Sequence, residues 1–261
     1  MKRVKLQLIK TDLLPTYLEK ISGIDQKLNA LQEAEISTDT FSFYTSVASV
    51  FSSKIEGENI DLDSFIKHKT MGVVFRFDYT KKTDDLYEAY QFAKLNELTP
   101  VNIQSAHRLL SRNLVAAHQQ GELRTNIMYV VTDEGKIEYV ATSPYELKTE
   151  MGKWFADLAT LLEAELTAEA VFFFAAILHL TFVKIHPWND GNGRSARLIE
   201  KWFIASKLGD KAWLLQSEKN YYRLHAHYYQ NLRLLGLEYE TLVYSSALPF
   251  LLMLPKCLEK E

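Results

Sequence analysis

Hydrophobic side chains recur at helical spacing along most of this 261-residue chain. Residues 14–34 carry leucines and isoleucines along one helical stripe, which predicts a first helix. The same spacing predicts a second helix from about Thr40 to Glu56. It should end at Gly57, because glycine favours the position just after a helix. Further helices are predicted over residues 84–98, 100–113, 144–164, 168–185, 194–208, 217–234 and 239–254. The pattern is that of a mainly helical protein.

One segment departs from helical spacing. Residues 128–131 and 137–140 are short runs rich in β-branched and aromatic side chains, and the five residues 132–136 between them are typical of a turn. This pattern predicts a β-hairpin, which is too small to form a sheet domain. Such a hairpin is either a structural element or a flap at the rim of a site. The predicted fold class is therefore all-α with one small β-hairpin flap.

Composition and charge exclude several other classes of protein. Ten glycines and six prolines are too few for the many tight turns of an all-β sandwich or barrel. A net charge of −3 provides no basic excess for binding the nucleic-acid backbone, so we expect no nucleic-acid partner. The longest apolar stretch, residues 170–178, is too short to span a bilayer and is typical of a buried core helix, so we expect no membrane partner.

The single cysteine, Cys257, and the start of the chain bear on its location. One cysteine cannot form an internal disulfide, which suits a reducing compartment. The first residues carry charge but no apolar segment behind it, so the sequence predicts no signal peptide. We therefore expect a cytoplasmic protein.

The most unusual segment is residues 186–197, HPWNDGNGRSAR. Pro187 disfavours the helical conformation at His186, so the preceding helix should end there. A new helix should begin at about Gly193 or Arg194. The unpaired N–H groups and the positive dipole end at its start form a binding site for an anion. The segment therefore predicts a turn between two helices that holds an anion.

The side chains of this turn point to phosphate chemistry. Arg194 and Arg197 are three residues apart on the predicted helix, so both guanidinium groups can face the same anion. Asp190 offers the hard oxygen ligand that Mg²⁺ prefers on a phosphate. His186 lies across the turn as a candidate general base. Together these residues predict an enzyme of phosphoryl or nucleotidyl transfer.

Two rival motifs fit less well. Residues 191–196, GNGRSA, match the G-x-G-x-x-A fingerprint of dinucleotide-binding proteins, but that fingerprint needs a preceding strand, and a helical pattern precedes it here. The phosphate-binding G-x-x-x-x-G-K-S/T pattern is absent from the sequence. His225 and His227 look like a metal pair, but residues two apart on a helix do not share a face, which disfavours a metal nuclease.

Residues 186–197 resemble the motif of the Fic family, H-P-F-x-D/E-G-N-G-R-x-x-R, with Trp188 where phenylalanine is usual. The lead-in 179–186 and the segment Gly121-x-x-Arg124-Thr125 are also similar to Fic proteins. The resemblance covers roughly residues 95–235. It implies an N-terminal helical region over 1–94, a Fic-like core over 95–235 and a C-terminal helical extension over 236–261.

A second segment strengthens the resemblance. Residues 52–57, SSKIEG, fit the inhibitory pattern of the family, S/T-x-x-x-E-G/N. They lie on the N-terminal side of the core, at the end of the predicted helix over about 40–57, as in members that carry the inhibition in the same chain. The resemblance implies that Glu56 pairs with Arg197 and so misaligns the nucleotide.

The activity implied by the resemblance is that of a protein adenylyltransferase (AMPylase). Such an enzyme transfers AMP from ATP to a Ser, Thr or Tyr hydroxyl of a target protein. His186 would accept the hydroxyl proton, and Asp190 would hold Mg²⁺ on the phosphates. The nucleotide would be bound by Gly191, Asn192, Gly193, Arg194, Arg197 and Tyr222. The hairpin residues Ile137, Glu138, Tyr139 and Val140 would clamp the target as an added strand.

Three alternatives stay open at the level of the sequence. In some relatives the inhibitory glutamate positions water, so the chain might instead remove AMP from a modified protein. A different phosphate-containing donor would fit the same motif. A non-catalytic nucleotide-binding module is also an alternative, although the intact His186, Asp190 and Arg194 argue against it. The sequence leaves open the target and whether the chain forms a homo-oligomer.

Overall fold

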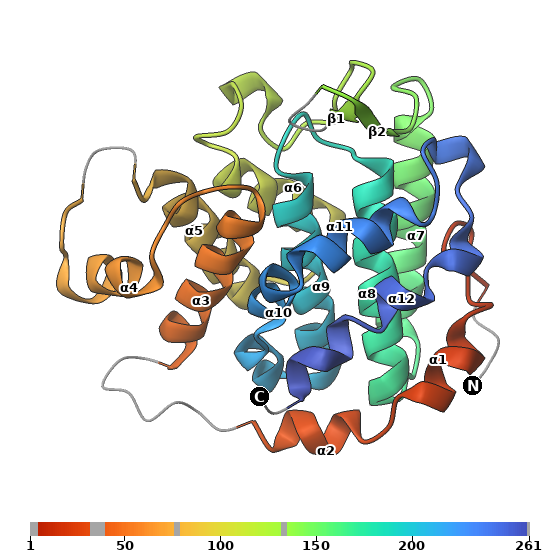
Figure 1. Cartoon of the computed structure of the whole chain (residues 1–261), viewed down its shortest axis with the longest axis horizontal. Helices are drawn as coiled ribbons and strands as arrows, with labels where there is room; N and C mark the ends of the chain where they lie inside the picture. The colour runs from red at the N-terminus through yellow and green to blue at the C-terminus, as the bar shows by residue number, and fades with distance from the viewer. Residues whose placement is uncertain (1–4, 32–39, 76–78, 132–134, 260–261) are drawn as a thin grey trace.

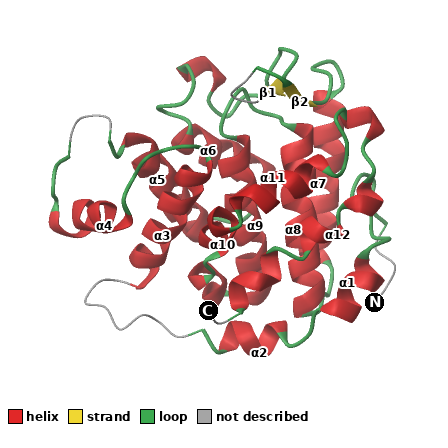
Figure 2. Ribbon diagram, viewed as in Figure 1, coloured by secondary structure: helices red, strands yellow, loops and turns green. Residues whose placement is uncertain are grey.

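The computed structural model describes residues 5–31, 40–75, 79–131 and 135–259 (Figure 1). Helices make up most of this part of the chain, and one two-stranded antiparallel hairpin is its only sheet (Figure 2). The predicted fold class is therefore confirmed. The helices are α1 (Leu14–Lys20), α2 (Ile24–Asn29), α3 (Thr40–Ile55), α4 (Leu62–Met71), α5 (Lys81–Leu95), α6 (Pro100–Leu110), α7 (Leu147–Glu163), α8 (Ala168–Ile185), α9 (Asn192–Leu208), α10 (Ser217–Arg223), α11 (His225–Arg233) and α12 (Leu248–Leu251).

Helix α8 forms the centre of the fold. It packs against α9, and α1, α2, α7 and α12 also contact it. Its 18 residues are long and apolar enough to cross a membrane, but 89% of them are buried inside the protein. Apolar side chains on every face of a helix are expected when other helices surround it. We therefore identify α8 as the core helix that the sequence predicts.

The hydrophobic core is shared by all parts of the chain. One cluster of buried apolar side chains includes Leu28 and Leu86 from the first 94 residues, Trp154 from the middle and Leu254 near the end. Helix α3, which carries the segment matching the inhibitory pattern, packs on α5 and α10, and ten of its 16 residues are buried. The three predicted regions therefore pack together, and the boundaries proposed between them stay a prediction.

Several helices differ from the expected ones. The first predicted helix is interrupted at Gly23, which has a φ of 70° and separates α1 from α2. Its last residues, 32–34, lie outside the described part. The predicted helix over 217–234 is interrupted at Leu224 between α10 and α11. The predicted helix over 239–254 is wrong: short 3₁₀ turns lead to the four-residue α12. Pro249 has no N–H for a continuing helix, so it suits only a first turn.

Helix α4 was not predicted. It is short, and Phe65 is its only buried residue, so it has almost no apolar stripe to detect. A local signal was present, because Asp61 caps the helix by accepting the N–H of Ser64 at 2.9 Å.

The hairpin lies at the end of α8. Strands β1 (Tyr129–Val131) and β2 (Ile137–Val140) pair antiparallel, with a register shift between Val130 and Val131. Beneath them the buried Tyr139 donates its hydroxyl to the carbonyl of Lys184 at 2.6 Å, in the last turn of α8. The predicted hairpin is confirmed, although its loop falls partly outside the described residues.

Candidate active site

The turn between α8 and α9 begins at His186, the only non-glycine residue with positive φ in the described part of the chain. Its φ of 56° and ψ of 61° place it in the left-handed region, which is uncommon for such a side chain. Its N–H still donates to the carbonyl of Phe182 at 2.9 Å. Helix α8 therefore ends there, as Pro187 predicts, and the imidazole is turned away from the helix.

A buried arginine, Arg124, holds this conformation. Its Nε donates to the carbonyl of His186 at 2.7 Å, and its backbone N–H donates to the carbonyl of Pro187 at 2.9 Å. Its other guanidinium nitrogens donate to the carbonyls of Asn126 (2.6 Å) and Thr142 (2.5 Å). Arg124 therefore joins the end of α8, whose last carbonyls lack helical partners, to the segments that flank the hairpin. The sequence pointed to Arg124 only through the resemblance.

We expect Arg124→Met to lower the free energy of unfolding by roughly 3 kcal/mol. The substitution removes the donors of several buried carbonyls, and each unsatisfied buried group costs about 1–3 kcal/mol. Urea denaturation would measure the change. The matched control is Arg112→Met, whose guanidinium pairs with Glu88 at the surface, where a loss below about 1 kcal/mol is expected. Equal losses in the two variants would contradict the role of Arg124.

A stacked pair of rings supports the middle of the turn. Trp188 is fully buried, and its ring lies on that of His107 with the centroids 4.4 Å apart. The N–H of Gly121 donates to Nδ1 of His107 at 2.8 Å, so the proton is on Nε2, which donates to the carbonyl of Asp190 at 3.0 Å. Burial lowers the pKa of His107 to about 4, so this neutral form persists at pH 7. His107 was not singled out by the sequence.

Helix α9 begins at Asn192, slightly earlier than predicted. The Asn192 side chain ties the turn together by accepting the N–H of Trp188 at 2.8 Å and donating to its carbonyl at 2.9 Å. Gly191 precedes the helix with a φ of 79°, and a Cβ there would lie 2.9 Å from Leu110. The first N–H groups of α9 have no helical acceptor. The predicted helix start is therefore present, and the binding of an anion there stays a prediction.

Both arginines of this helix start are buried, and each meets a carboxylate from the turn after α3. Arg197 donates to Oε1 of Glu56 at 2.6 Å and to Oγ of Ser52 at 2.8 Å. Arg194 lies 3.4 Å from Oε1 of Glu58. The pairing of Glu56 with Arg197 that the resemblance implied is therefore present in the structure. The contact of Glu58 was not predicted.

The carboxylate of Glu56 lies at the start of α9. A Cβ on Gly193 would collide with its Oε1, so glycine is required for this approach. Burial alone would raise the pKa of Glu56, but the charges of Arg197 and Arg194 outweigh it and lower the pKa below its usual value. Glu56 is therefore ionised at neutral pH and acts as an anion at the anion site.

His186 faces the same space. Its Nδ1 lies 3.2 Å from the carbonyl of Val183, which can only accept, so the neutral ring keeps the lone pair on Nε2. Burial lowers its pKa to about 4, and the charges of Arg124 and Lys184 also favour the neutral form, whereas the Val183 contact and the charge of Glu56 oppose this. His186, Glu56 and Gly193 line one cavity of about 150 Å³. The ring is therefore in the form that a general base requires.

The pKa of His186 predicts a flat activity profile near neutral pH. Because the pKa is about 4 rather than about 6.5, the imidazole stays neutral as the pH falls through 6, and protonation removes the base only near pH 4. For a reaction in which His186 acts as the general base, we expect kcat/KM to stay constant above about pH 5.5. An NMR titration of the free protein would measure the midpoint directly. A midpoint close to the usual value for histidine would contradict the prediction.

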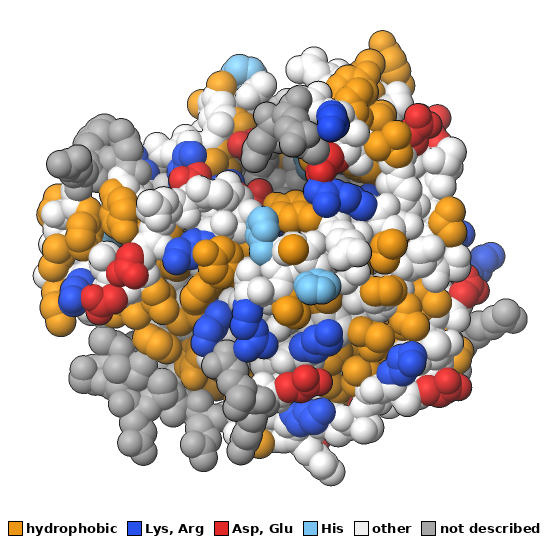
Figure 3. Space-filling view, in the orientation of Figure 1, with side chains coloured by type: hydrophobic (Ala, Val, Ile, Leu, Met, Phe, Trp, Pro, Cys, Tyr) orange, Lys and Arg blue, Asp and Glu red, His pale blue; other side chains and the backbone are white. Residues whose placement is uncertain are grey.

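Other predicted residues line the open groove of about 970 Å³ beside this cavity. Tyr222 is 37% exposed, and its ring lies 5.5 Å from that of Phe51, with Nζ of Lys54 5.4 Å from its centroid. Glu56 and Glu138 line the same groove. Figure 3 shows acidic, basic and histidine side chains close together around the hollow below the hairpin. Tyr222 therefore lies beside the anion site.

The hairpin reaches this rim through β2. Glu138 forms an ion pair with Arg233 of α11, and Ile137 is 52% exposed. The N–H of Val140 donates to the carbonyl of Leu237 at 2.8 Å. This bond occupies the Val140 end of the outer edge of β2, which is part of the edge that the resemblance implies for the target.

Asp190 is exposed at the mouth of the turn. Its Oδ1 accepts the N–H of Gly191 at 2.6 Å, which orients the carboxylate. The described residues contain no cluster of three or more His, Cys, Asp or Glu side chains that could hold a metal ion alone. One carboxylate fits Mg²⁺, because this ion is commonly held by one or two carboxylates together with substrate phosphates.

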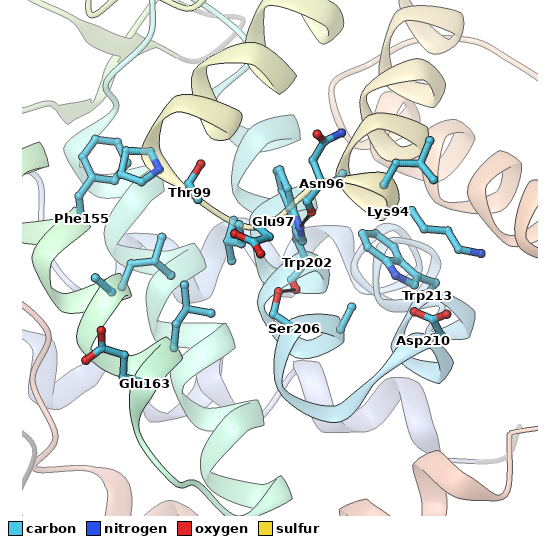
Figure 4. A pocket seen from close by; sticks show the side chains of 18 residues that line it. Lys94, Asn96, Glu97, Thr99, Phe155, Glu163, Trp202, Ser206, Asp210 and Trp213 are labelled. Carbon is cyan, nitrogen blue, oxygen red and sulfur yellow. Dashed lines mark hydrogen bonds between the residues drawn. The ribbon is translucent and has the colours of Figure 1, made fainter.

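Another groove, of about 670 Å³ and so larger than the cavity at His186, lies elsewhere, between the ends of α5, α7 and α9 (Figure 4). Phe155, Trp202 and Trp213 line it together with Glu97. None of the predicted site residues reaches it. Its size therefore does not make it the candidate site, because the anion-binding turn and His186 lie around the other cavity.

The helical fold and this turn define a protein with a histidine beside an anion-binding helix start. Residues 97–204 match the sequence model of the Fic/DOC family, so this part of the chain is similar to a Fic/DOC domain. Proteins with a Fic domain typically transfer nucleotide-derived groups to proteins. No curated protein matches the chain.

Solved structures share the fold over nearly the whole chain. A Fic family protein from Desulfovibrio desulfuricans G20 is 18% identical, with a TM-score of 0.76 over 97% of this chain and 74% of that one. A Fic domain-containing signaling protein from Bacteroides thetaiotaomicron is 19% identical, with a TM-score of 0.64 over 97% and 88%. Fic-1 from C. elegans is 18% identical, with a TM-score of 0.63 over 94% and 70%. At these identities the likeness is one of fold.

Proposed function

We propose that the chain is a protein adenylyltransferase that transfers AMP from ATP to a hydroxyl side chain of a target protein. The observation that carries this proposal is the meeting of a neutral histidine, His186, with a helix start that bears the buried Arg194 and Arg197. An anion-binding helix start beside a base is what attack on a phosphate requires.

The reaction follows from these positions. Nε2 of His186 accepts the proton of a Ser, Thr or Tyr hydroxyl, whose oxygen forms a bond to the α-phosphorus. The bond from that phosphorus to the bridging oxygen breaks, and pyrophosphate leaves. The N–H groups at the start of α9 stabilise the charge on the transferred phosphate, and Arg194 and Arg197 bind the outer phosphates.

Mg²⁺ would be held by Asp190, whose exposed carboxylate keeps one oxygen beyond the bond to Gly191. Bound there, the ion supplies positive charge to the α- and β-phosphates. Tyr222, in the adjoining groove, would contact the base of the nucleotide. The Ile137 side of β2 would hold the target segment as an added strand.

Glu56 keeps the enzyme inhibited in this proposal. Its carboxylate holds Arg197, the cation for the terminal phosphate, and its charge repels that phosphate. ATP then binds with its α-phosphate out of line for attack. The 2.6 Å contact of an ionised Glu56 with a fully buried Arg197 supports this assignment.

The position of the label tests the transfer. A Glu56→Gly variant is incubated with ATP labelled at the α-phosphate and, separately, at the γ-phosphate. AMP transfer incorporates the α label into protein and releases the γ label with pyrophosphate. Incorporation of the γ label would contradict AMP transfer. If the protein were labelled only by a different labelled nucleotide, that nucleotide rather than ATP would be the donor.

Removal of AMP is a second candidate. The ionised Glu56 lies in one cavity with His186, where its carboxylate can orient a water molecule toward a phosphate. A target modified beforehand would then release AMP with the wild-type chain but not with Glu56→Gly.

A further inference from the structure

The turn that follows α3 presents two carboxylates to α9. The N–H of Glu58 donates to the carbonyl of Ser53, and that of Gly57 to the carbonyl of Lys54, both at 3.1 Å. Gly57 has a φ of 87°. These two hydrogen bonds cap the C-terminal end of α3, with Gly57 in the left-handed conformation. It fixes Glu56 and Glu58 on either side of the glycine, where each contacts a different arginine.

Glu58 is shared between two cations. Its Oε1 lies 2.7 Å from Nζ of Lys82, in the first turn of α5, and 3.4 Å from Nη2 of Arg194. The contact with Lys82 is the shorter one, so Glu58 keeps a partner even when Arg194 turns elsewhere. The side chain of Glu58 is 31% exposed, whereas that of Arg194 is 3% exposed.

The guanidinium group of Arg194 has few hydrogen-bond partners in this arrangement. Its Nε is buried and has no hydrogen-bond partner within the described residues, and its single ion pair is long and shared. Buried guanidinium nitrogens are normally paired, so an unpartnered one at a helix start points to an anionic ligand that completes it. The ligand that the proposed function supplies is the outer phosphates of a nucleotide.

We propose that Glu58 sets the affinity for nucleotides with outer phosphates by competing with those phosphates for Arg194. When the phosphates bind Arg194, Glu58 stays on Lys82, so no carboxylate is left without a counter-ion. This inference rests on the proposed function, because it requires a nucleotide at the start of α9. It assigns Glu58 a role that differs from that of Glu56, since Glu58 weakens binding whereas Glu56 misaligns the bound nucleotide.

A comparison of ATP with AMP tests the inference. Affinities are measured by calorimetry with Mg²⁺ in a His186→Asn background, so that no turnover occurs and the left-handed conformation at this position is kept. We expect Glu58→Gln to tighten ATP binding about three- to tenfold, because the substitution removes a competing charge near the outer phosphates. Binding of AMP, which lacks these phosphates, stays unchanged. The matched control is Glu122→Gln, whose carboxylate pairs with Arg108 at the surface and should change neither affinity.

Lys82→Met tests the second half of the inference. Without Lys82, Glu58 has only Arg194 as a partner, so ATP binding should weaken. In the Glu58→Gln background the same substitution should have no effect. Weaker ATP binding in both backgrounds would mean that Lys82 contacts the phosphates itself, which overturns its role as the counter-ion of Glu58.

The outcomes separate this inference from the proposed function. Nucleotide binding that is present but insensitive to Glu58→Gln, or equal changes for ATP and AMP, would overturn the role of Glu58 and leave the proposed function standing. No binding of ATP by either form would overturn both. Thermal unfolding of each variant verifies that it is folded.

Discussion

Replacing Glu56 with glycine is expected to raise AMP transfer, measured as self-modification, about 10- to 100-fold. A hydrogen bond to a charged group contributes about 1.5–3 kcal/mol, and each 1.4 kcal/mol corresponds to about a factor of ten. The substitution frees Arg197 for the terminal phosphate and removes the carboxylate from the start of α9. Incorporation of label from ATP labelled at the α-phosphate measures the rate.

Two further variants sharpen this result. Glu56→Gln keeps the shape of the side chain but loses its charge, so we expect a rate close to that of Glu56→Gly if charge is the main cause. Glu122→Gln removes a surface carboxylate far along the chain and should leave the rate unchanged. A Glu56→Gly variant that transfers no faster than the wild type would remove the inhibitory role of this residue.

Loss of His186 should have the opposite effect. In the Glu56→Gly background, His186→Ala is expected to lower the transfer rate about 10²- to 10⁴-fold, because a positioned general base contributes that much. The positive φ of His186 adds a complication, since alanine tolerates the left-handed region poorly. His186→Asn is therefore the matched variant, because asparagine adopts this conformation more readily and cannot act as the base.

The two substitutions are expected to agree. If His186→Ala lost activity while His186→Asn kept it, the backbone conformation rather than the imidazole would matter. Transfer that survives in both variants would exclude His186 as the base. Circular dichroism and ATP affinity, measured for each variant, separate loss of chemistry from loss of the fold.

Local signals in the sequence accounted for the turn itself. Pro187 ends one helix, and the glycines allow the next to begin at Asn192. The break between the two helices could therefore be predicted from residues adjacent in the sequence. The hairpin was predicted for the same reason, because alternating side chains and a turn-rich stretch lie next to each other in the chain. Structural features that depend on only a few consecutive residues could therefore be predicted from the sequence.

Contacts between segments far apart in the chain could not be predicted from the residue pattern alone. Glu56 and Arg197 are 141 residues apart, and no spacing rule joins them, so only the resemblance to a family predicted their pairing. Glu58 lies outside the patterns of that family, so its contact with Arg194 came from the folded chain. His107 looked like an ordinary residue of α6, because its partners are the backbone of Gly121 and Asp190.

The packing of α3 has a consequence for how the proposed inhibition would end. Ten of the 16 residues of this helix are buried, and Phe41, Ala48 and Ile55 belong to the shared core, so moving the helix aside would expose apolar surface to water. Glu56 lies just past its end, where rotation about side-chain bonds alone can release Arg197. Release of Arg197 by such a rotation needs no domain displacement. The resting enzyme should therefore show a small constant leak, and whatever activates it needs to capture only one carboxylate.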